Sequence, residues 1–179
     1  AAPGGKTAHV LERADVSLVA VDRDAARLPR IVENLTRLGL SADVREGDAA
    51  EPQSWWDGTP FDRILVDAPC SSTGIIRRQP DVRLHRRATD IAPLAATQQR
   101  ILRALWPLLA PGGRLVYATC SVQKAENEAV IAAFRAEVTQ AQSVAIPETY
   151  GRAAGDGRQN LPGSGGMDGF FYAVLEKPR

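Results

Sequence analysis

The two cysteines of the sequence, Cys70 and Cys120, are the residues that most directly suggest covalent chemistry. Each follows an apolar run that predicts a central strand, within the segments 67–71 (DAPCS) and 118–121 (ATCS). An isolated cysteine is usually a small buried apolar residue, but this shared placement argues against that interpretation. A thiolate is nucleophilic near neutral pH and leaves readily afterwards, and a nearby carboxylate such as Asp67 can assist proton transfer. The pair predicts a site that works through a covalent thiol adduct.

Two further acidic residues follow predicted strands and suit a nucleoside ligand. Asp22 ends the apolar run 16–22, and its ionised carboxylate could accept hydrogen bonds from both hydroxyls of a ribose. Asp48 follows the next predicted strand and could accept a hydrogen bond from the amino group of an adenine. Taken alone, Asp22 also fits a solvated turn, and Gly47-Asp48 is also an ordinary turn dipeptide. Both interpretations stay open at this point.

The first residues, AAPGGKT (1–7), predict a glycine-rich loop that leads into a helix. Such glycines let a ligand approach the backbone at the positive end of the helix. The segment 5–7 also matches the end of a phosphate-binding P-loop, with 64–67 as the strand and metal-binding Asp of a nucleotide hydrolase. Against this, the first glycine of that motif would precede Ala1, and Pro3 lacks an N–H group for the phosphate cradle. A dehydrogenase is disfavoured because the spacing G-x-G-x-x-G is missing.

These residues need a scaffold in which strand ends meet, and hydrophobic periodicity predicts one. The expected strands are 16–22, 42–45, 61–66, 114–118 and 170–175, and the expected helices are 28–38, 94–109 and 130–138. Residues 111–113 predict a turn, and 147–168, rich in glycine and proline, predict a long surface loop. The alternation predicts an α/β fold with a doubly wound, mostly parallel sheet. Such sheets bind ligands at the carboxyl ends of their strands.

Composition limits what the chain can bind through its overall charge. The 179 residues are 44% hydrophobic, which predicts one domain with one substantial core. The 22 basic and 21 acidic residues nearly cancel, so nucleic-acid binding requires a local basic patch. Such a patch, which could hold RNA phosphates, is formed by Arg77, Arg78, Arg83, Arg86 and Arg87. A solvated helix face is the alternative explanation of these arginines.

The sequence contains no segment typical of a membrane protein or of a secreted protein. No apolar run approaches the length of a membrane span, and no signal peptide is recognisable, so we expect a cytoplasmic protein. Thiols in that compartment normally stay reduced, which predicts two free cysteines. We expect no bound metal and no membrane partner, and we expect a monomer.

Taken together, the motifs resemble the RNA cytosine-5 methyltransferases of the NOL1/NOP2/Sun group, and within it the bacterial branch that modifies small-subunit ribosomal RNA. The match covers nearly the whole chain. Its motifs are AAPGGKT (1–7), the strand end at Asp22, Gly47-Asp48, DAPCS (67–71), Thr73-Gly74 with Arg77-Arg78, YATCS (117–121) and DGFF (168–171). The resemblance implies a Rossmann-like class I methyltransferase fold, S-adenosylmethionine as cofactor and 16S ribosomal RNA as substrate.

The resemblance also implies a role for each motif. Carbon 5 of cytosine accepts a methyl group only after a nucleophile has added at carbon 6. Cys120 would form that bond and Cys70 would help to free the product, although the Pro-Cys motif of DNA cytosine methyltransferases makes Cys70 the alternative nucleophile. The cofactor would be held by Ala1, Ala2, Pro3, Gly4, Gly5 and Lys6 at its methionine end, Asp22 at the ribose, Asp48 at the adenine, and Asp67 beside the target base.

The chain departs from this family in where it begins. Family members have a central first strand just before the glycine loop, and RNA-binding domains before that strand. We therefore expect 1–179 to be a fragment of the catalytic domain that lacks both. A P-loop-like nucleotide hydrolase and a noncatalytic RNA-binding module remain as alternatives of a different class.

Overall fold

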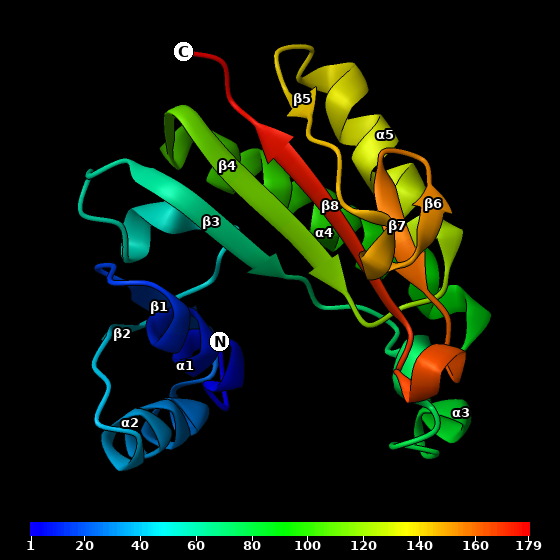
Figure 1. The fold of residues 1–179 in the computed structure, drawn as a ribbon, viewed down its shortest axis with the longest axis horizontal. Coiled ribbons are helices and arrows are strands. Elements are labelled where there is room, and N and C mark those ends of the chain that lie inside the picture. Colours follow the sequence, from blue (N-terminus) through cyan, green and yellow to red (C-terminus); the bar gives the residue numbers. More distant parts are fainter. The chain divides into compact units, whose positions relative to one another are not determined.

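The computed structural model describes residues 1–179, which form two compact units, Ala1–Thr59 and Pro60–Arg179 (Figure 1). The sequence analysis predicts one domain and gives no sign of this division. Each unit is described by itself.

The first unit has two helices and a two-stranded parallel sheet. Its elements are α1 (Gly5–Arg13), β1 (Val19–Asp22), α2 (Leu28–Arg37) and β2 (Asp43–Glu46), with short 3₁₀ helices η1 (Ala25–Arg27) and η2 (Pro52–Ser54). Ala8, Ile31 and Leu35 form its small core. The helix expected at 28–38 is confirmed. The strand expected from residue 16 begins only at Val19, and Val16 lies outside the sheet with 46% of its surface exposed.

The second unit has a six-stranded sheet. Its strands are β3 (Phe61–Asp67), β4 (Leu109–Thr119), β5 (Gln142–Ser143), β6 (Arg152–Ala154), β7 (Gly157–Asn160) and β8 (Phe170–Glu176). They follow the order β3-β4-β8-β7-β6, and β5 pairs with β8. The β3–β4 pair is parallel, whereas every other pair in this sheet is antiparallel. The antiparallel part is larger than the sequence analysis expects.

Helices cover one face of this sheet and form the main core with it. The helices are α3 (Val82–His85), α4 (Ile91–Leu105) and α5 (Glu128–Glu137), and α4 and α5 lie against the sheet (Figure 1). The short 3₁₀ helices are η3 (Thr73–Ile75), η4 (Ala88–Asp90), η5 (Trp106–Leu108), η6 (Lys124–Glu126), η7 (Glu148–Tyr150) and η8 (Ser164–Gly166). Leu102, Leu115 and Phe134 are fully buried between these layers. Trp106 meets Phe134 edge to face, with ring centroids 5.6 Å apart.

Two expectations about this unit are wrong. The helix expected to reach residue 109 ends at Leu105, because Pro107 falls in the short helix η5 and Leu109 already begins β4. The surface loop expected over 147–168 contains the hairpin of β6 and β7, which extends the sheet beyond β8. The sequence of β7, GRQN, has no apolar alternation that would have predicted a strand. Its buried Gln159 is held by hydrogen bonds. A Cβ on Gly157 would come within 2.4 Å of the Tyr172 carbonyl oxygen, so the close strand pairing requires glycine there.

The described chain also lacks certain features. None of its helices combines the length and the apolar character needed to cross a bilayer. No three His, Cys, Asp or Glu side chains are grouped as a metal site. Both cysteines are free thiols, as the sequence analysis expects.

Candidate active site

The ends of two neighbouring parallel strands bring the two thiols together. Cys70 follows β3 and Cys120 follows β4, and these strands pair in register up to Asp67 and Ala118. The Sγ atoms of Cys70 and Cys120 are 3.4 Å apart, a hydrogen-bond distance for sulfur. Cys70 is buried, whereas Cys120 is only partly buried. The topology thus makes one site of two residues that are 50 positions apart.

The pKa values of the two thiols are shifted in opposite directions. The hydrogen bond with Cys70 lowers the pKa of Cys120 to about 6, against burial, which raises it, and a contact with the Ser72 hydroxyl lowers it further. The same hydrogen bond, together with burial, raises the pKa of Cys70 far above its ordinary value. Cys70 is therefore the neutral donor and Cys120 the thiolate at neutral pH. A thiolate with a neutral thiol beside it is a nucleophile with a ready partner for proton transfer.

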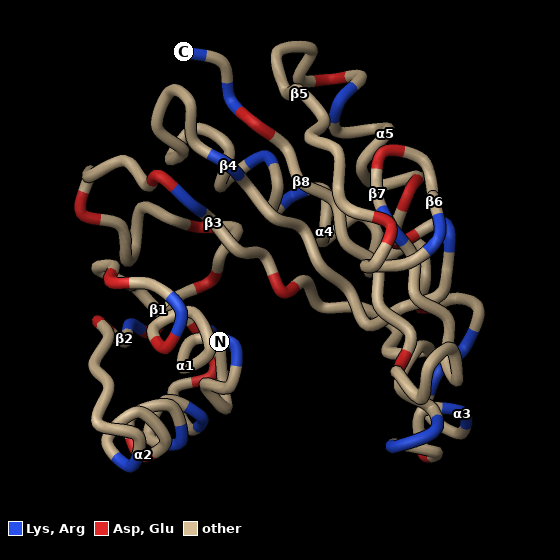
Figure 2. Tube along the Cα trace, viewed as in Figure 1, with Lys and Arg blue, Asp and Glu red and all other residues tan.

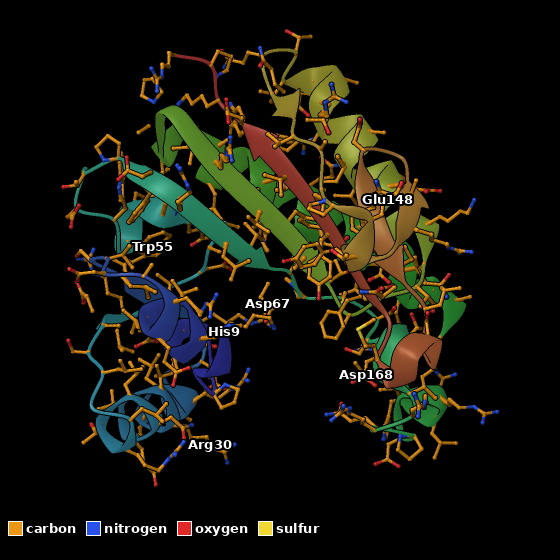
Figure 3. All side chains as sticks on the ribbon, viewed as in Figure 1. His9, Arg30, Trp55, Asp67, Glu148 and Asp168 are labelled. Atoms are coloured by element: carbon orange, nitrogen blue, oxygen red, sulfur yellow. The ribbon has the colours of Figure 1, made fainter.

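Asp67 lies close to this pair. It ends β3, and its side chain projects from the carboxyl end of that strand (Figure 3). Its negative charge opposes ionisation of the Cys120 thiol, and it is the second cause, after burial, of the raised pKa of Tyr172 on β8. Asp67 and Cys120 therefore share one electrostatic environment, and the assisting role of Asp67 stays a prediction.

A buried carboxylate missed by the sequence analysis connects the two cysteine loops. Glu126, in η6, is 0% exposed. Its Oε1 accepts hydrogen bonds from the Ser71 amide at 2.8 Å and the Gln98 side chain at 3.2 Å, and its Oε2 accepts from the hydroxyls of Ser71 at 2.5 Å and Ser121 at 2.6 Å. Ser71 and Ser121 each directly follow a cysteine in the chain. No periodicity or motif in the sequence indicates this connection.

Glycine lets a third loop approach the cysteine loops. The Gly74 amide donates to the carbonyl of Cys120, and the Gly169 amide donates to the carbonyl of Gly74, both at 2.8 Å. A Cβ on Gly74 would lie 2.0 Å from the Gly169 oxygen. The DGFF segment that begins at Asp168 therefore packs against both thiol loops.

The predicted RNA-binding arginines divide into two groups. All five are exposed, and basic residues recur along the chain around α3 (Figure 2). Two of them also make hydrogen bonds or ion pairs: Arg86 donates to the carbonyl oxygen of Ser71 at 3.0 Å, and Arg78 pairs with Asp168 at 2.6 Å. Arg78 and Arg86 thus also hold the segment to the loops at the thiol site.

In the first unit, Asp22 fixes the N-terminal loop at the end of β1. One carboxylate oxygen accepts from the Ala1 nitrogen and from the Ala2 amide, both at 2.7 Å, and the other accepts from the Asp24 amide at 3.1 Å. Burial raises the pKa of Asp22, and the hydrogen bonds from the Ala2 and Asp24 amides lower it. The carboxylate is therefore ionised and retains lone pairs that a ribose could use.

Side chains from η1 and α2 hold the same loop from the other side. Arg27 donates to the carbonyl of Ala2 and Asn34 to that of Pro3, both at 2.9 Å. Gly4, which precedes α1, has a left-handed φ of 99°, and a Cβ there would lie 3.2 Å from the backbone of Ile31. The sequence analysis missed Arg27 and Asn34, because an exposed polar residue on a helix has no distinguishing pattern.

Asp48 lies in a turn after β2, beside the end of β1. The Gly47 amide donates to the carbonyl of Asp22 at 3.1 Å, so the two acidic strand ends are neighbours. The Asp48 side chain accepts from the Ala50 amide, and the Trp55 indole donates to the Asp48 carbonyl, both at 2.8 Å. Trp55 therefore packs under this turn. Asp22, Asp48 and the glycine loop are thus neighbours in the first unit, and their binding of a cofactor stays a prediction.

Comparisons with known proteins agree with this geometry. Residues 1–176 match the family model for 16S rRNA methyltransferase RsmB/F. The chain is 56% identical over 178 residues to ribosomal RNA small subunit methyltransferase B of Vibrio cholerae, covering 99% of this chain and 40% of that protein. The chain thus spans about two fifths of the length of the curated relatives it matches.

Solved structures show the same fold. NSun6 from Pyrococcus horikoshii, determined with SFG, superposes with a TM-score of 0.88 at 29% identity, over 100% of this chain and 46% of that one. A methyltransferase homolog from the same organism gives a TM-score of 0.82 at 33% identity, over 99% of this chain and 59% of that one. The predicted Rossmann-like class I methyltransferase fold is confirmed.

Proposed function

Because the chain belongs to the 16S rRNA methyltransferase RsmB/F family, we propose that it methylates carbon 5 of a cytosine in 16S ribosomal RNA, with S-adenosylmethionine as methyl donor. The observation that supports this reaction best is the thiol pair, in which the partly buried Cys120 has a pKa of about 6 and lies 3.4 Å from a neutral Cys70. Carbon 5 of cytosine is a poor nucleophile, and a thiolate added at carbon 6 activates it.

Cys120 is the attacking group in this proposal. Its Sγ forms a bond to carbon 6, and the electrons of the carbon 5–carbon 6 double bond move toward carbon 5 and the ring. Asp67 assists by accepting hydrogen bonds from the exocyclic amine of the base and from nitrogen 3 when that nitrogen is protonated. Cys70 is the poorer nucleophile, because burial and its hydrogen bond to Cys120 keep it protonated.

Cys70 acts after methyl transfer. Once the Sγ atom of Cys120 is bonded to carbon, it no longer carries the charge that held the proton on Cys70, so the pKa of Cys70 falls and its proton passes to solvent. The Cys70 thiolate then removes the proton from carbon 5. The electron pair of that C–H bond restores the double bond and expels Cys120 as a thiolate. Across the 3.4 Å contact, the charge on the Cys120 sulfur thus determines whether Cys70 keeps its proton or can act as a base.

The residues of the first unit fit the cofactor that the family implies. Asp22 is an ionised carboxylate with capacity for ribose hydroxyls, and the backbone of 1–6 lies at the start of α1, where a left-handed glycine brings main chain and ligand close. Asp48 would contact the adenine, and Asp67 the cofactor side of the target base. When bound, S-adenosylmethionine supplies the electrophilic methyl group.

The exposed arginines around α3 would hold the RNA. Arg77, Arg83 and Arg87 offer guanidinium groups to phosphates, and Arg78 and Arg86 support the loop that presents them. The cytosine must leave its stack to reach a partly buried thiol. The proposal includes the cytoplasmic location and monomeric state expected from the sequence.

Methyl transfer to unmodified 16S ribosomal RNA tests this proposal. With labelled S-adenosylmethionine, the full-length protein should form 5-methylcytosine, detected by mass spectrometry of the digested RNA, and Cys120→Ala should form none. Calorimetry should show that S-adenosylmethionine binds and that Asp22→Ala weakens this binding. The protein should not hydrolyse ATP in the presence of magnesium. Nucleotide turnover without methylation would instead support the hydrolase, and RNA binding unaffected by loss of both thiols, again without methylation, would support a noncatalytic module.

A further inference from the structure

Glu126 occupies a position that is costly for a carboxylate. Its side chain is fully buried, and its four hydrogen-bond donors are neutral: the amide and hydroxyl of Ser71, the hydroxyl of Ser121 and the amide of Gln98. Burial of a charge is unfavourable unless hydrogen bonds replace its lost hydration. Both oxygens are satisfied here, so the surrounding loops are arranged around this group.

The donors come from the two loops that hold the thiols. Ser71 follows Cys70, and Ser121 follows Cys120, and their Oγ atoms lie 3.1 Å apart while both donate to the same Glu126 oxygen. Thr73 completes this cluster, with its hydroxyl 3.2 Å from that of Ser71 and 3.3 Å from that of Ser121. One carboxylate oxygen therefore joins the two loops close to the thiols, in addition to the direct hydrogen bond from the Gly74 amide to the Cys120 carbonyl.

The backbone of Glu126 is held as well. The Tyr117 hydroxyl, on the buried face of β4, donates to the Glu126 carbonyl at 2.7 Å. The Gln98 side chain also donates to the carbonyl of Pro69 at 2.9 Å, next to Cys70. Glu126 is thus anchored to β4 through its backbone carbonyl and to α4 through its carboxylate.

We propose that Glu126 is a positioning residue: it ties the Cys70 loop to the Cys120 loop and so sets the contact between their sulfur atoms. The Glu126 carboxylate touches neither sulfur atom and acts only through Ser71 and Ser121. Its effect on the thiols is a property of this chain, whereas any effect on methylation rests on the proposed function.

The tie has a chemical consequence at Cys120. Without it, the loops separate, the Cys70 thiol no longer donates to the Cys120 sulfur, and the pKa of Cys120 rises toward the ordinary value of about 8.5. The other groups that face the pair are the Asp67 carboxylate from β3, the Tyr117 phenol from β4, the Ser72 hydroxyl, and Arg86, bound to the loop carbonyls. Replacement of Glu126 leaves the chemical identity of each of these groups unchanged.

Alkylation of Cys120 by iodoacetamide as a function of pH tests the proposal. In Glu126→Gln, an amide nitrogen replaces one of the two acceptor oxygens, so at most two of the four donors keep an acceptor. At pH 7 the alkylation rate of the Cys120 peptide, followed by mass spectrometry, should fall about tenfold or more, with its midpoint shifted upward. Circular dichroism and thermal unfolding establish that the variant is folded.

Glu128→Gln is the matched control. Glu128 lies two residues further on, is only partly buried and pairs with Lys124 at 3.4 Å, outside the network of hydroxyls. Its alkylation midpoint should equal that of the unchanged protein. An unshifted midpoint in a folded Glu126→Gln protein would overturn the proposal.

A second variant covers loss of folding. If Glu126→Gln does not fold, the double variant Ser71→Ala/Ser121→Ala removes both hydroxyl ties and leaves the carboxylate with the Ser71 and Gln98 amides. Its Cys120 midpoint should also rise, and an unshifted midpoint would contradict the proposal. A shifted midpoint in a protein that never methylates RNA would uphold the positioning role and reject the proposed function, so the two claims fail separately.

Discussion

Cys70 and Cys120 are chemically identical groups that the fold makes different. Cys70 is more deeply buried and donates, and Cys120 accepts and is more open to a substrate. The pKa difference depends on their mutual contact at 3.4 Å more than on any other neighbour. The reactivity of one thiol should therefore respond to replacement of the other.

Removal of the Cys70 thiol should make Cys120 less reactive. In Cys70→Ala the Cys120 thiolate loses its main hydrogen-bond donor, while burial and Asp67 still oppose ionisation, so the pKa of Cys120 should rise from about 6. Because the thiolate forms as pH rises through the pKa, the alkylation curve should move to higher pH. Cys70→Ser, which keeps a donor, should shift it less. Equal curves for all three proteins would contradict this assignment.

Sequence reasoning located the side chains that have distinctive chemistry and missed those that hold them. Cys70, Cys120 and Asp48 follow predicted strands and Asp22 ends one, and the structure places each at or just after the carboxyl end of its strand. Glu126 and Asn34 could not be predicted, because their partners are backbone or hydroxyl groups far away in sequence. Single-residue chemistry is visible in a sequence, whereas long-range hydrogen bonds are not.

At the scale of elements, the site is a meeting of three loops, after β3, after β4 and before β8. Ser72 adopts a left-handed φ of 61°, uncommon for a residue with a side chain, directly beside Cys70 and Cys120. The strands that support these loops were predictable from their apolar runs. The hairpin of β6 and β7 was not, because its residues are polar and its one deeply buried side chain is an amide.

Gly74→Ala should disrupt this meeting of loops. The added Cβ would lie 2.0 Å from the Gly169 oxygen and 2.8 Å from the Cys120 oxygen, both backbone atoms that cannot move aside cheaply. We expect a loss of about 1–3 kcal/mol in unfolding free energy, measured by denaturant titration. Gly5→Ala is the control for stability, since nothing lies within 4 Å of its added Cβ. Equal stability of the two variants would show that the loops tolerate separation.

At the scale of the whole molecule, the fold class was predictable and the division into units was not. Alternating strands and helices indicate an α/β protein, as the structural relatives confirm. Periodicity says which segments are strands but not which strands pair, so the separate sheets of Ala1–Thr59 and Pro60–Arg179 have no signal in the sequence. The net charge of +1 gives no general attraction to RNA. Under the proposed function, we therefore expect RNA affinity to come from the local arginines.

Removal of a single exposed arginine should therefore change how RNA affinity depends on salt. Each of Arg77→Ala, Arg83→Ala and Arg87→Ala should lower the slope of log affinity against log salt by about 1, since each removes one phosphate contact. Arg103→Ala, which removes an arginine paired with Glu137 on α4 and α5, should leave the slope unchanged. Filter binding over a range of salt concentrations measures both. Identical slopes for all four variants would place the RNA elsewhere.

Covalent capture of RNA tests the assignment of the two thiols most directly. Full-length Cys70→Ala, mixed with 16S ribosomal RNA and S-adenosylmethionine, should accumulate an enzyme–RNA adduct that survives denaturing electrophoresis, and peptide mapping should place the bond at Cys120. Cys120→Ala should form no adduct. An adduct formed by Cys120→Ala and mapped to Cys70 would contradict the account, because the buried, protonated thiol would then be the nucleophile.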